Sequence, residues 1–164
     1  MPTPKSFRSS GFSLIELSVA TAVYSLGLGS LSLMLMLAVR GTTEARFETA
    51  AAIQASSLAE MILMNSDAAG HYALASPPAT AACGPGATCS IEEMAAWQLS
   101  TWRDRLAAEL PGGSGVVCRD STPDDGTTED AACDGQGGDV IKIFWRPPAS
   151  DPDPVSARRV LRLP

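Results

Sequence analysis

The sequence predicts an α+β fold in which a long amino-terminal helix precedes a small globular head, as in a lollipop. Three observations predict it: an apolar run from residue 12 to 39, an apolar stripe at helical spacing that continues to about residue 65, and short alternating segments near the carboxyl end. The chain has 164 residues and a net charge of −6. This acidic balance argues against nucleic acid as a main partner, because such binding needs Lys and Arg to neutralise phosphates.

The apolar run predicts a membrane-spanning helix. Residues 17–39 contain no charge, and they would form about 34 Å of helix, enough to cross a hydrocarbon core of about 30 Å. A cleavable secretory signal has an apolar region of only about 7–15 residues. Lys5 and Arg8 precede the run and no acidic residue does, so we expect the amino terminus to stay in the cytoplasm and the rest to be exported.

The helix is expected to continue beyond the membrane, from about Ser13 to about Asn65. Its second half carries one apolar stripe at i, i+4, i+7, i+11 and i+15, which should pack on the head. The stripe consists of Phe47, Ala51, Gln54 with Ala55, Leu58 and Ile62.

The head is expected to contain a second helix and a small antiparallel sheet of about three strands. Ser90 and Glu93 form a capping box, and the following apolar spacing ends at Pro111. Residues 116–118, 139–145 and 158–163 have the composition of strands. Alternation in the middle strand predicts one face against the long helix and an opposite face, with Lys142, that is partly exposed to solvent.

Four cysteines lie outside the apolar run, at Cys83, Cys89, Cys118 and Cys133. An even number outside the membrane segment indicates two disulfides in an oxidising compartment, with free buried thiols as the alternative. Among the three possible connectivities we expect Cys83–Cys89 and Cys118–Cys133, because each pair is local and flanks a loop.

The sequence offers no catalytic set, and we expect no enzyme activity, cofactor or bound metal. The single histidine, His71, gives no convincing Ser/His/Asp arrangement, and it is interpreted as a surface or helix-end residue. A run of acidic residues lacks the EF-hand spacing, so a solvated loop is favoured over a calcium site. These residues are Asp120, Asp124, Asp125, Glu129, Asp130 and Asp134.

The amino-terminal stretch SGFSLIEL resembles the class III signal of type IV pilins and pseudopilins. It has a short basic leader that ends in Gly11, then Phe12, and then Glu16 in front of an uncharged run. The resemblance implies that prepilin peptidase cleaves between Gly11 and Phe12 and methylates the new amino group of Phe12. It also implies that Glu16 pairs with the amino-terminal ammonium of an adjacent subunit during assembly. The alternative is a spare interfacial charge on an ordinary anchor.

The resemblance implies four segments: a leader over 1–11, a membrane and assembly half of the helix over 12–40, an amphipathic periplasmic half over 41–66, and a disulfide-stapled head over 67–164. A cysteine loop, a Trp-containing helix, LPGGSG and VIKIFW are similar to the minor pilins called type IV pilus modification proteins (PilV).

The implied function is that of a non-catalytic minor pilin, a single-pass protein of the bacterial inner membrane with a periplasmic head. Its partners would be prepilin peptidase, other pilin subunits and the pilus assembly machinery, with incorporation into a pilus or pseudopilus after processing. A type II secretion pseudopilin is the nearest alternative. A membrane-anchored periplasmic module for ligand binding or adhesion, which does not polymerise, is an alternative of a different class.

Overall fold

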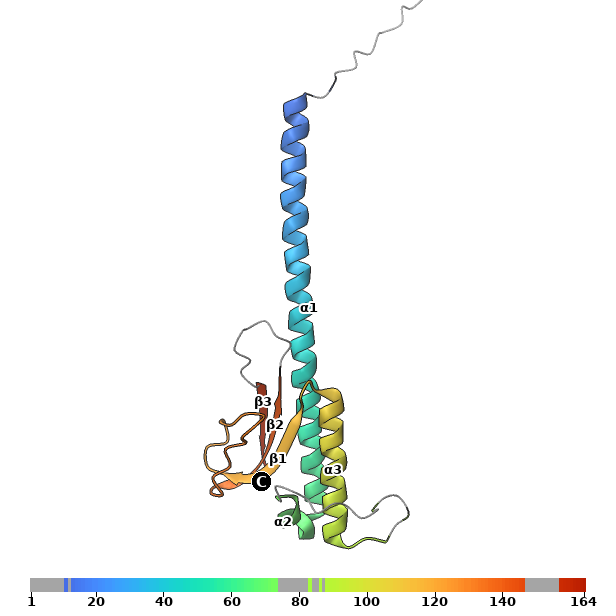
Figure 1. Cartoon of the computed structure of the whole chain (residues 1–164), viewed down its shortest axis with the longest axis vertical. Helices are drawn as coiled ribbons and strands as arrows, with labels where there is room; N and C mark the ends of the chain where they lie inside the picture. The colour runs from blue at the N-terminus through green and yellow to red at the C-terminus, as the bar shows by residue number, and fades with distance from the viewer. Residues whose placement is uncertain (1–10, 12, 74–82, 84–85, 87, 147–156) are drawn as a thin grey trace, which may run out of the picture. The chain divides into compact units, whose positions relative to one another are not determined.

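The computed structural model describes residues 11, 13–73, 83, 86, 88–146 and 157–164, and it is an α+β protein (Figure 1). The predicted long helix, second helix and three-stranded antiparallel sheet are confirmed, with two short helical segments in addition. The elements are α1 (Leu14–Met64), η1 (Ser66–Ala68), α2 (Ala69–Tyr72), α3 (Ile91–Glu109), β1 (Ser114–Asp120), β2 (Gly138–Trp145) and β3 (Ala157–Arg162).

The chain divides into two units, residues 1–43 and residues 44–164. We call them the amino-terminal unit and the compact unit. Helix α1 contributes to both, because its first 30 residues, 14–43, belong to the former and residues 44–64 belong to the latter. The compact unit therefore begins inside α1, and the second half of this helix belongs to the same unit as the sheet.

Within the compact unit, α1 buries the stripe that the sequence predicts. Its buried residues are Ala51, Gln54, Ala55, Leu58, Ala59 and Ile62, and Phe47 is partly buried against the same core. Two hydrogen bonds link α1 to α3. The indole Nε1 of Trp102 donates to the carbonyl oxygen of Gln54 at 3.0 Å, and Nε2 of Gln54 donates to Oε2 of Glu109 at 2.9 Å.

The start of α3 confirms the predicted capping box. Oγ of Ser90 accepts from the backbone N–H of Glu93 at 3.2 Å, and Oε2 of Glu93 accepts from the backbone N–H of Ser90 at 2.9 Å. These two bonds satisfy backbone donors that the first helical turn cannot pair internally. At the other end the chain leaves the helix through Gly112, whose φ of +62° favours glycine.

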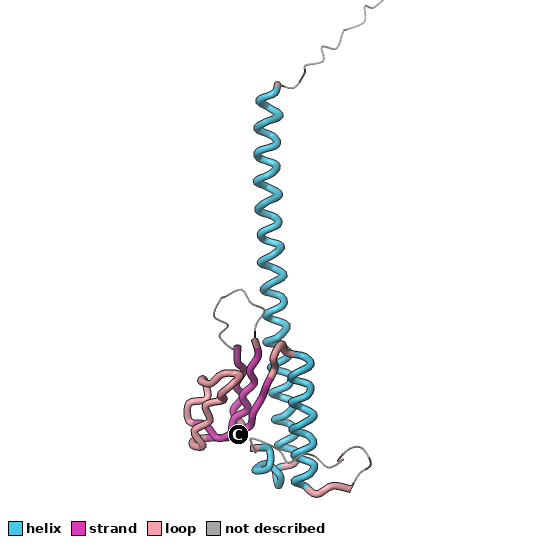
Figure 2. The backbone as a smooth tube through the Cα atoms, viewed as in Figure 1, coloured by secondary structure: helices cyan, strands magenta, loops and turns pink. Residues whose placement is uncertain are grey.

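The sheet has the order β1-β2-β3, and both strand pairs are antiparallel (Figure 1). Its strands are magenta in Figure 2. Val117 pairs with Ile141, and Ile141 pairs with Leu161 on the other side. The face of β2 formed by Ile141, Ile143 and Trp145 joins the core with α1 and α3.

The expectation of a partly solvent-exposed second face on β2 is wrong. Val140, Lys142 and Phe144 on that face are exposed by only 1%, 0% and 2%. Backbone and side-chain groups of the β1–β2 loop, residues 121–137, bond to Lys142, and Pro123 in this loop is also buried. The loop therefore covers the face of β2 that the alternating pattern predicted to be exposed to solvent.

The sequence also missed the short helical segments η1 and α2. No element is predicted between the long helix and Ser90, yet residues 66–72 form two short turns that bury Ala68 and Tyr72, each 0% exposed. The hydroxyl of Tyr72 bonds to Oε1 of Gln98 on α3. Tertiary burial of these two side chains, rather than helix propensity, accounts for the short turns.

Candidate functional site

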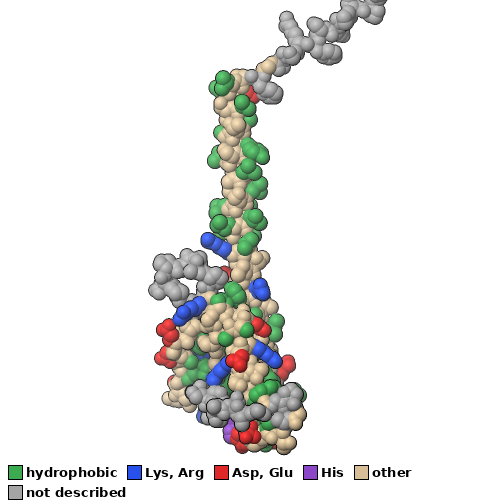
Figure 3. Space-filling view, turned by 45° about the vertical axis from the view of Figure 1, so that its right-hand side comes forward, with side chains coloured by type: hydrophobic (Ala, Val, Ile, Leu, Met, Phe, Trp, Pro, Cys, Tyr) green, Lys and Arg blue, Asp and Glu red, His purple; other side chains and the backbone are tan. Residues whose placement is uncertain are grey.

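The amino-terminal unit presents an apolar surface that nothing in the unit covers. Every described residue from 13 to 42 is exposed, and its large apolar side chains range from 47% exposure at Leu28 to 83% at Leu14. Hydrophobic side chains cover this part of α1 in the space-filling view (Figure 3). Within the described residues, α1 is the one helix that is long and apolar enough to cross a membrane.

The serine and threonine hydroxyl groups of residues 17–39 are satisfied within the helix itself. Each donates to a backbone carbonyl three or four residues earlier, at 2.8–3.0 Å; these residues are Ser18, Thr21, Ser25, Ser30 and Ser32. Such back-bonding removes the need for water as a hydrogen-bond partner. The segment can therefore enter an apolar environment without leaving these donors unpaired.

Glu16 is the one charged residue among the described residues 13–39, and it lies in the first turn of α1. A carboxylate is favoured there by the positive end of the helix dipole. Gly11 is exposed just before the helix, and a Cβ added to it would meet nothing within 4 Å. The structure thus places Gly11 and Glu16 at the same end of α1, whereas Phe12 lies outside the described residues.

Two disulfides join the cysteine pairs that the sequence predicts. Cys83 is bonded to Cys89 with a Cα–Cα distance of 5.9 Å, and Cys118 is bonded to Cys133 with a Cα–Cα distance of 6.2 Å. Cys118 lies in β1 and Cys133 lies in the β1–β2 loop. The second bond therefore ties this loop to the edge of the sheet.

The acidic loop contains a buried ion-pair network that sequence reasoning missed. Nζ of Lys142 contacts Oδ2 of Asp120 and lies 2.9 Å from Oδ1 of Asp125; the side chains of Lys142 and Asp120 are both 0% exposed. The interpretation of the whole acidic run as solvated is wrong for Asp120, whereas the side chain of Asp125 is 47% exposed. A lone lysine inside the apolar strand VIKIFW was the signal that could have indicated a buried acidic partner.

The titration of this network follows from its contacts. Burial opposes the charge on Lys142, but hydrogen bonds to Asp120 and Asp125 outweigh it and raise the pKa of the ammonium above its ordinary value. The hydrogen bond from Lys142, helped by one from Thr122, lowers the pKa of Asp125 below its ordinary value. Both shifts favour the charged forms, so Lys142 and Asp125 are ionised at neutral pH.

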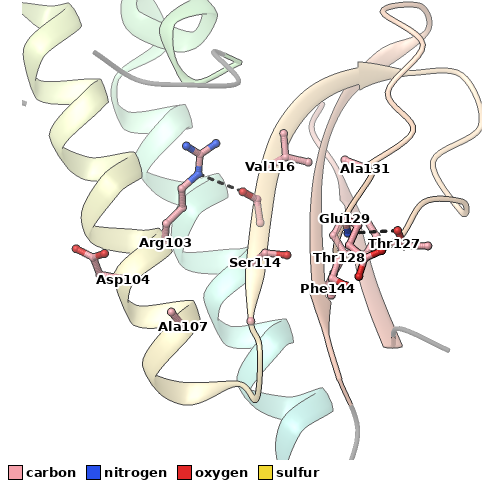
Figure 4. A pocket seen from close by; sticks show the side chains of 12 residues that line it. Arg103, Asp104, Ala107, Ser114, Val116, Thr127, Thr128, Glu129, Ala131 and Phe144 are labelled. Carbon is pink, nitrogen blue, oxygen red and sulfur yellow. Dashed lines mark hydrogen bonds between the residues drawn. The ribbon is translucent and has the colours of Figure 1, made fainter. Parts of the chain in front are cut away.

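A cleft of about 500 Å³ lies between α3, β1 and the β1–β2 loop (Figure 4). Arg103 and Asp104 extend from α3 on one side, and Thr127 and Glu129 lie on the loop opposite. Nε of Arg103 donates to the carbonyl oxygen of Gly115 at 3.2 Å, and burial lowers the pKa of this guanidinium. Arg103 thus links α3 to β1, and the cleft offers polar groups of both charges for non-covalent binding.

His71 occupies the position that the sequence suggests. It lies in α2, and its Nε2 is 3.6 Å from Oε1 of Glu92. Both side chains are substantially exposed, at 40% and 59%. His71 is therefore a surface residue at a helix end, with one solvent-exposed contact to a carboxylate.

Comparison with known proteins gives no further assignment. The chain matches no protein-family model, and no curated protein or solved structure is significantly similar to it. Sequence motif and site geometry are thus the basis for a functional proposal.

Proposed function

We propose that the protein is a non-catalytic minor pilin that is stored in the bacterial inner membrane and takes part in type IV pilus assembly or priming. Prepilin peptidase cleaves it between Gly11 and Phe12 and methylates Phe12. The amino terminus faces the cytoplasm and the disulfide-bonded compact unit faces the periplasm. Other pilin subunits and the assembly machinery of the inner membrane are its partners.

The exposed apolar segment of α1, with Glu16 in its first turn, is the observation that carries this proposal. A surface of this length needs lipid or other helices to cover it. In lipid, Glu16 stays near the interface, because a carboxylate at the bilayer centre costs about 2.5–3.5 kcal/mol on insertion scales. In a bundle of helices it becomes buried and needs a cation, which the Phe12 ammonium of a neighbouring subunit supplies.

Amino-terminal sequencing of the membrane-bound protein tests the processing step. We expect a mature chain that starts at methylated Phe12. Gly11→Val should block cleavage, because the peptidase must accommodate a residue without a side chain at this position. The uncut variant should still insert, since residues 17–39 are unchanged. An intact leader on the wild-type protein in its native host would rule out the pilin assignment.

Glu16→Ala separates storage in the membrane from assembly. Insertion and cleavage should proceed normally, but the neighbouring ammonium would lose its counter-charge in the bundle. Leaving one member of a buried pair alone costs about 3–5 kcal/mol, so incorporation into sheared filaments should fall about a hundredfold or more. Glu16→Gln should give an intermediate level, because it keeps a hydrogen bond without the charge. If Glu16→Ala enters filaments as readily as wild type, Glu16 is only an interfacial charge and has no role in assembly.

Two alternatives are distinguished by different measurements. A type II secretion pseudopilin would be processed in the same way, so deletion phenotypes decide: loss of pili supports the proposal, and loss of secretion supports the pseudopilin. A non-polymerising membrane-anchored module would bind its ligand in the cleft between α3 and the β1–β2 loop. That module would keep its leader and would be absent from sheared filaments.

A further inference from the structure

The two edges of the sheet differ in how their backbone groups are paired. β1 is the edge strand next to α3, and other parts of the compact unit bond to its outward carbonyls (Figure 1). Nε of Arg103 donates to the carbonyl oxygen of Gly115 at 3.2 Å, and the backbone N–H of Gly135 donates to the carbonyl oxygen of Arg119 at 3.0 Å. β3 forms the opposite edge, and among the described residues β2 is its only strand partner.

The strand register shows which backbone groups of β3 point away from β2. The backbone N–H of Leu163 donates to the carbonyl oxygen of Asp139 at 2.9 Å, so this pair is hydrogen-bonded. In an antiparallel ladder, hydrogen-bonded pairs alternate with pairs whose backbone groups point outward. Along the same register, Leu161 and Arg159 therefore face β2. The outward backbone groups belong to Arg158, Val160 and Arg162. They bond to no other described residue.

Three arginines flank these outward groups. Arg158 and Arg162 lie on one face of β3 with Val160 between them, and Arg159 lies on the other face. All three arginines are exposed, and their guanidinium groups form no ion pair within the part of the chain that the structure describes. The chain as a whole has a net charge of −6. β3 therefore concentrates positive charge on an acidic molecule.

Charge decides which kind of strand can add to this edge. A second copy of β3 would bring arginines close to arginines, and such repulsion prevents edges from pairing with themselves. An acidic strand would instead place carboxylates opposite Arg158 and Arg162. Because residues two and four apart in a strand point to the same face, its two acidic residues would be four positions apart. An apolar residue midway between them would lie opposite Val160, which is partly buried.

We propose that β3 is a docking edge for an extended acidic segment of a partner protein, which joins the sheet as a further strand. The segment has the pattern acidic–x–apolar–x–acidic. Its backbone pairs with the outward N–H and C=O groups of β3, and its carboxylates pair with Arg158 and Arg162. This inference does not rest on the proposed function, because the edge lies in the compact unit and its test depends on neither processing nor assembly.

Hydrogen exchange of the full chain in detergent micelles, resolved by residue with NMR, tests whether the edge is free. The amides of Arg158, Val160 and Arg162 should exchange at least about a hundredfold faster than those of Arg159 and Leu161, which bond to β2. Equal protection of the two sets would show that another part of the chain or a second copy already covers the edge. That result would overturn the proposal.

A capped peptide of sequence Thr-Asp-Thr-Val-Thr-Asp-Thr is the probe for docking. For a Kd of about 1 mM, about 5 mM peptide should slow exchange of the three outward amides roughly sixfold. A control peptide with Asn in place of both Asp residues should bind about three to ten times more weakly, because it lacks the two cross-strand charge pairs. No protection by the acidic peptide, or equal protection by the neutral peptide, would overturn the proposal.

Two variants locate the effect. Val160→Pro removes an outward N–H and no bond to β2, so the chain should fold as wild type and lose the protection by the peptide. Arg158→Gln combined with Arg162→Gln keeps the backbone and should weaken peptide binding about three- to tenfold. Arg46→Gln with Arg105→Gln removes two exposed arginines outside β3 and should leave binding unchanged.

The arginine pair decides the outcome if Val160→Pro does not fold. Protection that survives Val160→Pro in a folded chain would show that the peptide does not bind as an added strand, and it would overturn the proposal. So would equal loss of binding in the two arginine double variants, because the effect of charge would then not be specific to β3.

Discussion

Trp102→Phe tests whether the contact between α1 and α3 holds the compact unit together. Trp102 is 1% exposed, and its indole nitrogen donates to the carbonyl oxygen of Gln54 in the middle of the buried stripe of α1. The substitution removes this hydrogen bond, worth about 1 kcal/mol. It also leaves space where the second ring was, which adds about 1–2 kcal/mol. We therefore expect the free energy of unfolding to fall by about 2–3 kcal/mol.

The assay is thermal unfolding of the full chain in micelles, followed through the fluorescence of the buried Trp145. For a unit of this size, 1 kcal/mol corresponds to a change in Tm of roughly 3–6 °C. Trp102→Phe should therefore lower the Tm by roughly 6–18 °C.

Trp97→Phe is the matched control, because Trp97 lies on the same helix but is only partly buried. Its substitution should cost less than about 1 kcal/mol. If the two variants lose equal stability, the indole of Trp102 does not have the central role that its burial and hydrogen bond indicate, and the reasoning is refuted.

Three further predictions concern the sheet and its loop. Gly115→Ala would bring a Cβ within 2.3 Å of a ring carbon of Trp102, so it should lower the free energy of unfolding in urea by about 1–3 kcal/mol. Gly138→Ala is the control: its Cβ would meet nothing within 4 Å, so it should be nearly neutral. Reduction of the bridge that closes the β1–β2 loop should cost about 3 kcal/mol and expose the loop to proteolysis, with an unchanged cleavage pattern as the contrary result. Lys142 lowers the pKa of Asp125 below its ordinary value of 3.8. The ionised Asp125 therefore stabilises the folded state fully above its ordinary pKa, and this stabilisation is lost as the pH falls through the lower pKa of the folded state. Asp125→Asn should make the acid limb of the urea midpoint shallower, and an unaltered limb would contradict this assignment.

Local signals in the sequence were sufficient for the main elements. The helical stripe from Phe47 to Ile62 predicted the buried face of α1, and the capping box at Ser90 predicted the start of α3. Each signal lies within a few residues of the structure that it produces. The apolar run likewise identified a helix whose surface has no cover within its own unit.

The features that the sequence missed depend on contacts between distant residues. Tyr72 is buried against α3, where its hydroxyl bonds to Gln98, a residue 26 positions later in the chain. Lys142 finds its partners 17 residues away at Asp125 and on β1 at Asp120. Alternation in β2 gave the correct inner face, but it could not show that a polar loop folds back over the outer face. A strand pattern describes two faces without stating what covers either one.

The two units satisfy their surfaces in opposite ways, and this difference limits what the chain can do alone in water. The compact unit buries even a lysine, because Asp120 and Asp125 supply its counter-charges within the same unit. The amino-terminal unit pairs the serine and threonine hydroxyl groups of residues 17–39 internally but leaves its leucines and methionines exposed. These hydroxyl groups need no outside partner, whereas the apolar side chains are uncovered, which suits an environment that supplies apolar contacts and few hydrogen bonds. Glu16 is the exception in that segment. Under the proposed function, Glu16 lies at the lipid interface while the protein is in the membrane, where a carboxylate is tolerated. In a helix bundle, Glu16 selects the arrangement of subunits, because only an arrangement that brings a cation to it avoids an unpaired buried charge.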